Sequence, residues 1–141
     1  MQTILVTGST GVGKSTLLSA LAAQHKMTVI DPLIEAAKTW HEPSAATCGG
    51  VVIDHVHYLE DAKTVVSAAA EWCEQHAVSL WLGEIWRGEL ESKGIQIPAD
   101  TIELHLQRDA IDEPATPVAG QRTVGNLEQV LPLAQQIAAS A

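Results

Sequence analysis

Short apolar runs alternate along the chain with segments whose apolar residues recur every three or four positions. The runs are rich in β-branched and aliphatic residues and predict strands over residues 2–7, 27–31, 51–54, 78–82 and 101–106. The segments with helical spacing predict helices over residues 15–25, 33–40, 59–76 and 127–139. Residues 85–100 have no clear pattern apart from a short helical stretch at 89–92. Glycine and proline predict a surface loop over 41–50, and a loop or hairpin over 109–125.

Strands that alternate with helices predict βαβ units, and therefore an α/β fold with a mostly parallel sheet of about five strands and helices on both faces. The chain has 141 residues without an evident repeat or linker, which predicts one domain over residues 1–141. Ligands of such sheets bind at the carboxyl ends of the strands. The first, third and fourth predicted strands all end in residues suited to chemistry, so we expect one shared site there.

The most specific motif lies between the first strand and the first helix and is called the glycine loop below. It reads Gly8-Ser9-Thr10-Gly11-Val12-Gly13-Lys14-Ser15-Thr16. This is the phosphate-binding pattern G-x-x-x-x-G-K-[ST], or Walker A. Its glycines leave backbone N–H groups open to phosphate oxygens, and the helix that follows adds its positive end. We expect Lys14 to reach the β- and γ-phosphates and the Ser15 hydroxyl to bind Mg²⁺.

A second motif is the apolar run 51–53 followed by Asp54. An apolar strand that ends in aspartate is the Walker B pattern, whose carboxylate holds Mg²⁺, usually through a water, beside the Walker A hydroxyl. Asp31 also ends a predicted strand and is the weaker rival for this role. Its alternative role is a favourable interaction with the N-terminus of the helix predicted after it.

The charge balance bears on the partners. There are 17 acidic and 8 basic residues, giving a net charge of −9, which disfavours a non-specific nucleic-acid surface. Nucleic acid is expected only through the pore of an oligomer. Two cysteines without a pairing or metal pattern indicate a reducing compartment. We expect a cytoplasmic protein without membrane insertion, since the sequence contains neither a signal segment nor a long apolar run.

With both motifs in place, the whole chain resembles the P-loop NTPases. It is similar to their additional-strand (ASCE) division, which includes RecA-like and HerA/FtsK-type motor ATPases and Zot-like phage assembly ATPases. The resemblance implies a three-layer P-loop NTPase fold, with ATP and Mg²⁺ as ligands and ATP hydrolysis as the reaction. In these families the Walker B aspartate is commonly followed by a water-activating glutamate, often as Asp-Glu-x-His. This sequence has Asp54-His55-Val56-His57, so His55 occupies the position of the glutamate.

Another group must therefore orient the attacking water. Glu84 follows the fourth predicted strand, where the resemblance implies a polar sensor of the γ-phosphate, and is the first candidate. His55 is the second candidate. Fast hydrolysis also needs an arginine near the transferred phosphate, and Arg87 and Arg108, which follow predicted strands, are the better candidates. Each of these residues has an alternative role as an ordinary surface side chain.

Two other functions stay open. One is a P-loop nucleotide or small-molecule kinase in which Asp31 contacts the acceptor hydroxyl. The other is a slowly hydrolysing nucleotide-binding switch or assembly module, consistent with the missing glutamate. The guanine-reading motif Asn-Lys-x-Asp is absent from the sequence, so ATP is the expected nucleotide. The small size of the chain favours work as a homo-oligomer or beside a protein partner.

Overall fold

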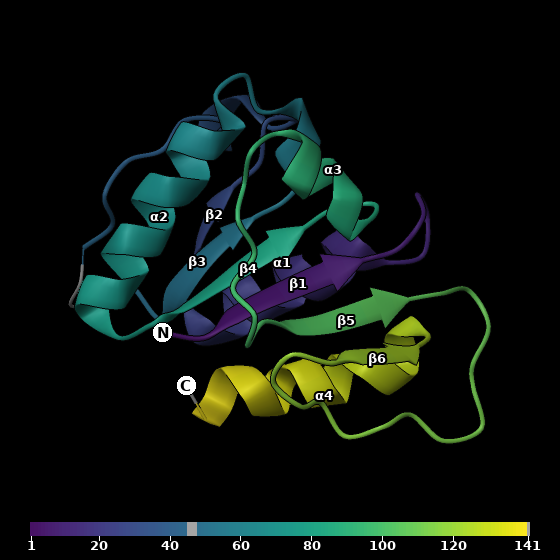
Figure 1. Ribbon diagram of the computed structural model, residues 1–141. Helices are drawn as coiled ribbons and strands as arrows, with labels where there is room; N and C mark the ends of the chain where they lie inside the picture. The colour runs from purple at the N-terminus through teal and green to yellow at the C-terminus, as the bar shows by residue number, and fades with distance from the viewer. Residues whose placement is uncertain (45–47, 141) are drawn as a thin grey trace.

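The structure, a computed structural model that describes residues 1–44 and 48–140, is a parallel sheet flanked by helices (Figure 1). Its six strands run in the order β2-β3-β4-β1-β5-β6, and every neighbouring pair is parallel. The strands are β1 (Thr3–Thr7), β2 (Thr28–Ile30), β3 (Gly50–Ile53), β4 (Ser79–Gly83), β5 (Ile102–Leu106) and β6 (Arg122–Gly125). The helices are α1 (Lys14–His25), α2 (Ala62–His76), α3 (Arg87–Ser92) and α4 (Leu127–Ser140), with 3-10 turns η1 (Glu35–Ala37) and η2 (Val56–Tyr58). The predicted α/β class is confirmed.

Helices cover both faces of the sheet because successive side chains of a strand point to opposite faces. In β1, Ile4 and Val6 belong to the apolar cluster that packs against α1 and α4. Leu5, between them, belongs to the second cluster, which packs against α2 and α3. The central strands are therefore apolar on both sides, as strands buried between two helical layers must be.

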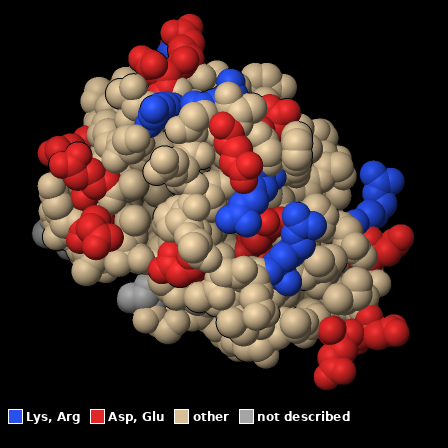
Figure 2. Space-filling model, in the orientation of Figure 1, with Lys and Arg blue, Asp and Glu red and all other residues tan. Residues whose placement is uncertain are grey.

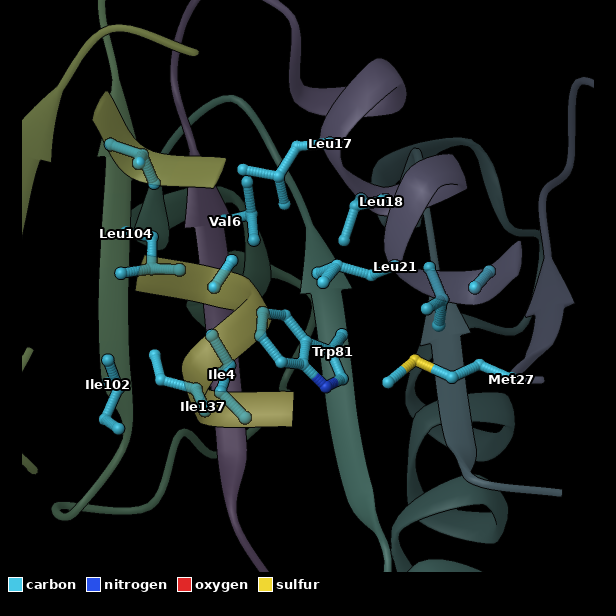
Figure 3. Close-up of a cluster of buried hydrophobic side chains, with 14 of the residues drawn as sticks. Ile4, Val6, Leu17, Leu18, Leu21, Met27, Trp81, Ile102, Leu104 and Ile137 are labelled. Carbon is cyan, nitrogen blue, oxygen red and sulfur yellow. The ribbon is translucent and has the colours of Figure 1, made fainter. Parts of the chain in front are cut away.

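Trp81 of β4 lies at the centre of the cluster beneath α1 and α4 (Figure 3). Its side chain is fully buried, and its indole Nε1 donates a 2.9 Å hydrogen bond to Ser79 Oγ. The hydrogen bond matters because a buried N–H without a partner destabilises the fold. Burial of each large apolar side chain in this cluster stabilises the fold by roughly 1.5–3 kcal/mol.

The sheet contains one strand more than the sequence pattern predicts. β6 lies inside the stretch 109–125, which we predicted as a loop or hairpin. It pairs with β5 alone, opposing Arg122 to Glu103 and Val124 to His105. A four-residue edge strand carries too little alternation to stand out from the Pro- and Gly-rich stretch before it.

The helix predicted over residues 33–40 does not form. Instead the chain winds around Asp31, whose carboxylate accepts a 2.9 Å hydrogen bond from the Leu33 N–H and whose own N–H donates to the Ala37 carbonyl at 2.8 Å. Only η1 remains of the helix. Leu33 and Ile34 are 59% and 50% exposed, so the apolar residues that suggested a helix bury little against the sheet.

The remaining differences concern boundaries. The helix predicted over residues 59–76 begins only at Ala62, because η2 and an extended Leu59 come first. The short helical stretch predicted at 89–92 is α3. The loop predicted over 41–50 includes 45–47, which lie outside the described residues, and its last residue, Gly50, begins β3.

None of the described helices has the length and apolar character needed to span a membrane.

Candidate functional site

The carboxyl ends of β1, β3 and β4 meet at one edge of the sheet, where the arrowheads point in Figure 1. A cavity of about 400 Å³ opens there. Nine of the predicted site residues line it, together with residues of η2 and the segment after β4: Thr10, Gly11, Gly13, Lys14, Ser15, Thr16, Asp54, His55 and Glu84. The prediction that polar strand ends share one site agrees with this arrangement.

The glycine loop runs from the end of β1 to the first residue of α1, and its glycines allow its course. Gly8 has a φ of +143°, and a Cβ there would lie 2.5 Å from the Leu106 carbonyl oxygen. Gly13, the N-cap of α1, has a φ of +103°, which L side chains rarely adopt. The loop therefore ends at a helix N-terminus beside the cavity, a place where backbone N–H groups favour anions.

Lys14 spans the glycine loop. Its Nζ donates hydrogen bonds to the carbonyl oxygens of Gly8 at 2.6 Å and Ser9 at 3.0 Å. Burial lowers the pKa of Lys14 from its usual value, while the nearby carboxylates of Asp54 and Glu84 act to raise it. An amine at the edge of this cavity can neutralise the negative charge of a bound anion.

Ser15 and Asp54 join the two motifs across the sheet. The Ser15 hydroxyl donates a 2.7 Å hydrogen bond to Asp54 Oδ2, although the residues are 39 positions apart. Asp54 is only 4% exposed, and its other oxygen accepts the His55 N–H at 2.8 Å. Two adjacent oxygen donors of this kind fit Mg²⁺, which prefers hydroxyl, carboxylate and water ligands.

Asp31 and His55 extend this group of donors. His55 Nδ1 lies 3.0 Å from Asp31 Oδ1 and 3.6 Å from Asp54 Oδ2. One donor atom from each of these three residues lies within 4.8 Å of the others. His55 has a φ of +50°, an uncommon conformation that aims its ring at the two carboxylates. A role for His55 in contact with the Asp31 and Asp54 carboxylates is therefore an alternative to the hypothesis that His55 orients water.

Glu84 is buried at the end of β4, with 1% of its surface exposed. Its Oε2 accepts the His57 N–H at 2.9 Å, and its Oε1 accepts the Ile85 N–H at 2.8 Å. The ring of His57 packs against the same carboxylate, with Nδ1 2.7 Å from Oε1. Glu84 thus lines the cavity, but its oxygens are already engaged by its neighbours.

The predicted arginines lie away from the cavity lining. Arg87, at the start of α3, has its Nε 3.8 Å from Glu91 Oε1. Arg108 is exposed just after β5. Arg122, the third late arginine, pairs with the buried Glu103 at 2.7 Å. Of the lysines and arginines in the described part of the chain, Lys14 alone lines the cavity.

Five lining residues did not appear among the predicted site residues: Leu33, His57, Tyr58, Gly83 and Ile85. His57 carried a signal, since it stands three positions after Asp54 in the Asp-x-x-His pattern. Tyr58 follows His57, and the centroids of the His57 and Tyr58 rings lie 4.1 Å apart. Leu33 carried none, because its place depends on how the chain winds around Asp31.

The chain was compared with protein-family models, with curated proteins and with solved structures, and none of the three comparisons found a match. What the site does must therefore be argued from its geometry. The glycine loop, Lys14, the oxygen donors Ser15 and Asp54, and the buried Glu84 with the half-buried ring of His57 beside it surround one cavity. These are the groups needed to bind a phosphate chain with a divalent cation and to deprotonate a nucleophile beside it.

Proposed function

We propose that this chain is a Mg²⁺-dependent ATPase of the P-loop NTPase class, in its additional-strand division. The observation that carries the proposal is the 2.7 Å hydrogen bond between Ser15 and Asp54. It joins the residue after the loop lysine to the aspartate at the end of β3, as a shared Mg²⁺ site requires. The position of β4 between β1 and β3 supports the division, because it is the additional strand between the two motifs.

In the proposed complex the glycine loop wraps the phosphates. Lys14 moves from the Gly8 and Ser9 carbonyls to the β- and γ-phosphate oxygens. Ser15 and Asp54 would hold Mg²⁺, which, when bound, would neutralise charge that develops on the phosphates. In this proposal the nucleophile is water, and the buried Glu84 with the ring of His57 lies beside the loop where it would act on that water.

We also propose that the protein works as a homo-oligomer or with a protein partner. The support is that neither Arg87 nor Arg108 lines the cavity, while phosphoryl transfer is accelerated by an arginine near the γ-phosphate. A neighbouring subunit or partner would supply that group. Figure 2 shows acidic and basic side chains interspersed on the face it displays, which disfavours a broad nucleic-acid surface there.

Nucleotide binding and phosphate release by the Lys14→Ala variant test the proposal. We expect wild-type protein with Mg²⁺ to release phosphate from ATP, and the variant to lose at least about 100-fold in turnover, the scale for removing one transition-state donor. Lys63→Ala is the matched control because Lys63 is exposed on α2 and lies outside the cavity lining. Equal turnover by Lys14→Ala and Lys63→Ala would contradict the site assignment.

The same assay separates an ATPase from a kinase when it is run with and without nucleotide acceptors. Steady phosphate release without an acceptor supports the ATPase. Consumption of ATP only when an acceptor is present would replace it by the kinase, with Asp31 as the residue to test. Binding of ATP with neither reaction would support the switch or assembly module.

A further inference from the structure

Glu84 is a buried carboxylate whose hydrogen-bond partners, among the described residues, are His57 and Ile85. It accepts hydrogen bonds from the main chain of His57 and Ile85, and its Oε1 also lies 2.7 Å from the His57 ring. The side chain of Glu84 is 0% exposed. A carboxylate so enclosed has little room to bind the attacking water itself. Its contacts instead hold the position and orientation of His57.

His57 lies against this carboxylate and lines the same cavity. Its side chain is 19% exposed and lines the cavity, with Nδ1 toward Glu84. The Nδ1 and Oε1 atoms are at hydrogen-bond distance but are not aligned for a hydrogen bond. Such contacts commonly align only when substrate is bound. Nε2 makes no hydrogen bond to any residue that the structure describes, so it is the nitrogen left for a ligand.

The other histidine of the motif is differently engaged. His55 directs Nδ1 at Asp31 and Asp54, on the side of the cavity where the metal ligands lie. His57 faces Glu84 at the end of β4. The two histidines therefore divide the polar end of the site between a metal-binding side and a side with a buried base.

We propose that His57 is the catalytic base for the attacking water, and that Glu84 is the residue that positions it. This inference rests on the proposed ATPase function. The water oxygen forms a bond to the γ-phosphorus as the bond from that phosphorus to the β,γ-bridging oxygen breaks. The electron pair of the broken bond leaves with ADP. The proton of the water passes to His57 Nε2, and from there to solvent after phosphate is released.

This arrangement explains how the site can act without a glutamate directly after Asp54. The carboxylate is supplied from β4 and reaches water through an imidazole. A carboxylate that faces Nδ1 favours the tautomer with a proton on Nδ1 and a free lone pair on Nε2. That tautomer is the one a base needs on the cavity side.

The test compares turnover with nucleotide affinity in two His57 variants. We expect His57→Ala and His57→Gln to lower kcat by about 10²–10⁴-fold, the usual contribution of a general base. Their affinity for a non-hydrolysable ATP analogue with Mg²⁺, measured by calorimetry, should stay within about threefold of wild type. Added imidazole should restore turnover to His57→Ala, which leaves space for it, and not to His57→Gln. His76→Ala is the control, since His76 stacks on Trp72 far from the cavity and should behave as wild type.

The positioning role of Glu84 has its own readout. In ¹⁵N NMR of the ligand-free protein, His57 should carry its proton on Nδ1, and Glu84→Gln should shift the ring toward the other tautomer. The same variant should lower kcat without a matching loss of affinity, and imidazole should not rescue it. A His57 tautomer that Glu84→Gln leaves unchanged would overturn the positioning role.

Two further outcomes would overturn the proposal in different ways. If His57→Ala and His57→Gln both hydrolyse ATP as fast as the wild type, the role of His57 is overturned and the ATPase function stands. A wild-type protein that neither binds nor hydrolyses ATP would overturn the base and the proposed function together. Using two variants guards against a single substitution that fails to fold.

Discussion

Gly83 ends β4 beside the aspartate that ends β3. A Cβ at Gly83 would lie 2.5 Å from Asp54 Oδ1 and 2.7 Å from Leu18 Cδ1. Both neighbours are buried, so neither can move aside easily. The absence of a side chain at this residue is therefore what allows the Asp54 carboxylate to stand beside β4 and meet Ser15.

We expect Gly83→Ala to destabilise the protein by about 1–3 kcal/mol, the usual cost of overpacking, and to weaken Mg²⁺-dependent turnover because Asp54 is displaced. Urea unfolding and phosphate release would measure the two effects. Gly88→Ala is the matched control. The atoms nearest to a Cβ there belong to the Trp86 ring, which is 57% exposed and held by one exposed hydrogen bond to Glu89, so it can turn aside. If both variants match wild type, the argument about Asp54 is wrong.

Cys73 illustrates how burial alters the reactivity of a thiol. It lies on the inner face of α2, fully buried against the sheet. Burial raises the pKa of its thiol to about 12, far above the usual value, so at pH 8 almost none of it is thiolate, the reactive form. Cys48 is only partly buried.

An alkylating reagent at pH 8 should therefore modify Cys48 while Cys73 stays unmodified until the protein unfolds. Mass spectrometry of digested protein would show which cysteine is labelled and when. The Cys48→Ser variant should show no rapid labelling while it is folded. In urea it should be labelled at its one remaining cysteine, Cys73. Rapid native labelling of Cys73 would mean that α2 opens from the sheet far more often than its packing implies.

At the scale of elements, the start of α4 is held by a pair of reciprocal side-chain bonds. Asn126 Oδ1 accepts the Gln129 N–H at 3.1 Å, and Gln129 Oε1 accepts the Asn126 N–H at 3.1 Å. This is a capping box, which satisfies N–H groups that a helix N-terminus leaves unpaired. The Gln129 side chain also binds the main chain of Ile111: its Oε1 accepts the Ile111 N–H, and its Nε2 donates to the Ile111 carbonyl oxygen. The same residue therefore holds the loop before β6.

We expect Asn126→Ala to lower the free energy of unfolding by about 1 kcal/mol and Asn126→Asp to preserve it, because aspartate also caps helices. Gln129→Ala should cost more than Asn126→Ala, since it removes the loop contacts as well. Chemical denaturation of the three variants measures the order. A smaller cost for Gln129→Ala would show that the loop contributes nothing through Ile111.

At the scale of the molecule, one sheet separates two apolar clusters. Trp81 lies in the cluster beneath α1 and α4, and Trp72 lies in the cluster beneath α2. Both clusters contain residues of β1, β3 and β4, so neither can form without the central strands. We predict from this that the chain is a single cooperative domain.

Unfolding followed by ¹⁹F NMR of fluorotryptophan-labelled wild-type protein tests the prediction. The native signals of Trp72 and Trp81 should disappear at the same urea concentration, as two-state unfolding requires. Assignment needs one Trp→Phe variant for each signal. Two separate midpoints would mean that the two faces of the sheet unfold independently.

Much of the fold follows from local patterns. The first five strands, α1, α2 and α4 are apolar at the spacing of their own type, so periodicity was enough to find them. The glycine loop and Asp54 were found because motif chemistry depends on residues close together in sequence. By contrast, β6 exists only because β5 offers it an edge. The helix predicted after Asp31 is missing because the Asp31 carboxylate and main chain bind that segment in another conformation.

By itself the sequence determined the alternation of strands and helices, the phosphate-binding pattern and the aspartate at the end of β3, because each is written in neighbouring residues. Tertiary structure alone decided the strand order, the Ser15–Asp54 contact and the burial of Glu84 against His57. Glu84 and His57 are 27 positions apart, and they meet only where β3 and β4 pair in parallel. Periodicity reports which face of an element is buried, whereas partners across a sheet are set by strand order and register.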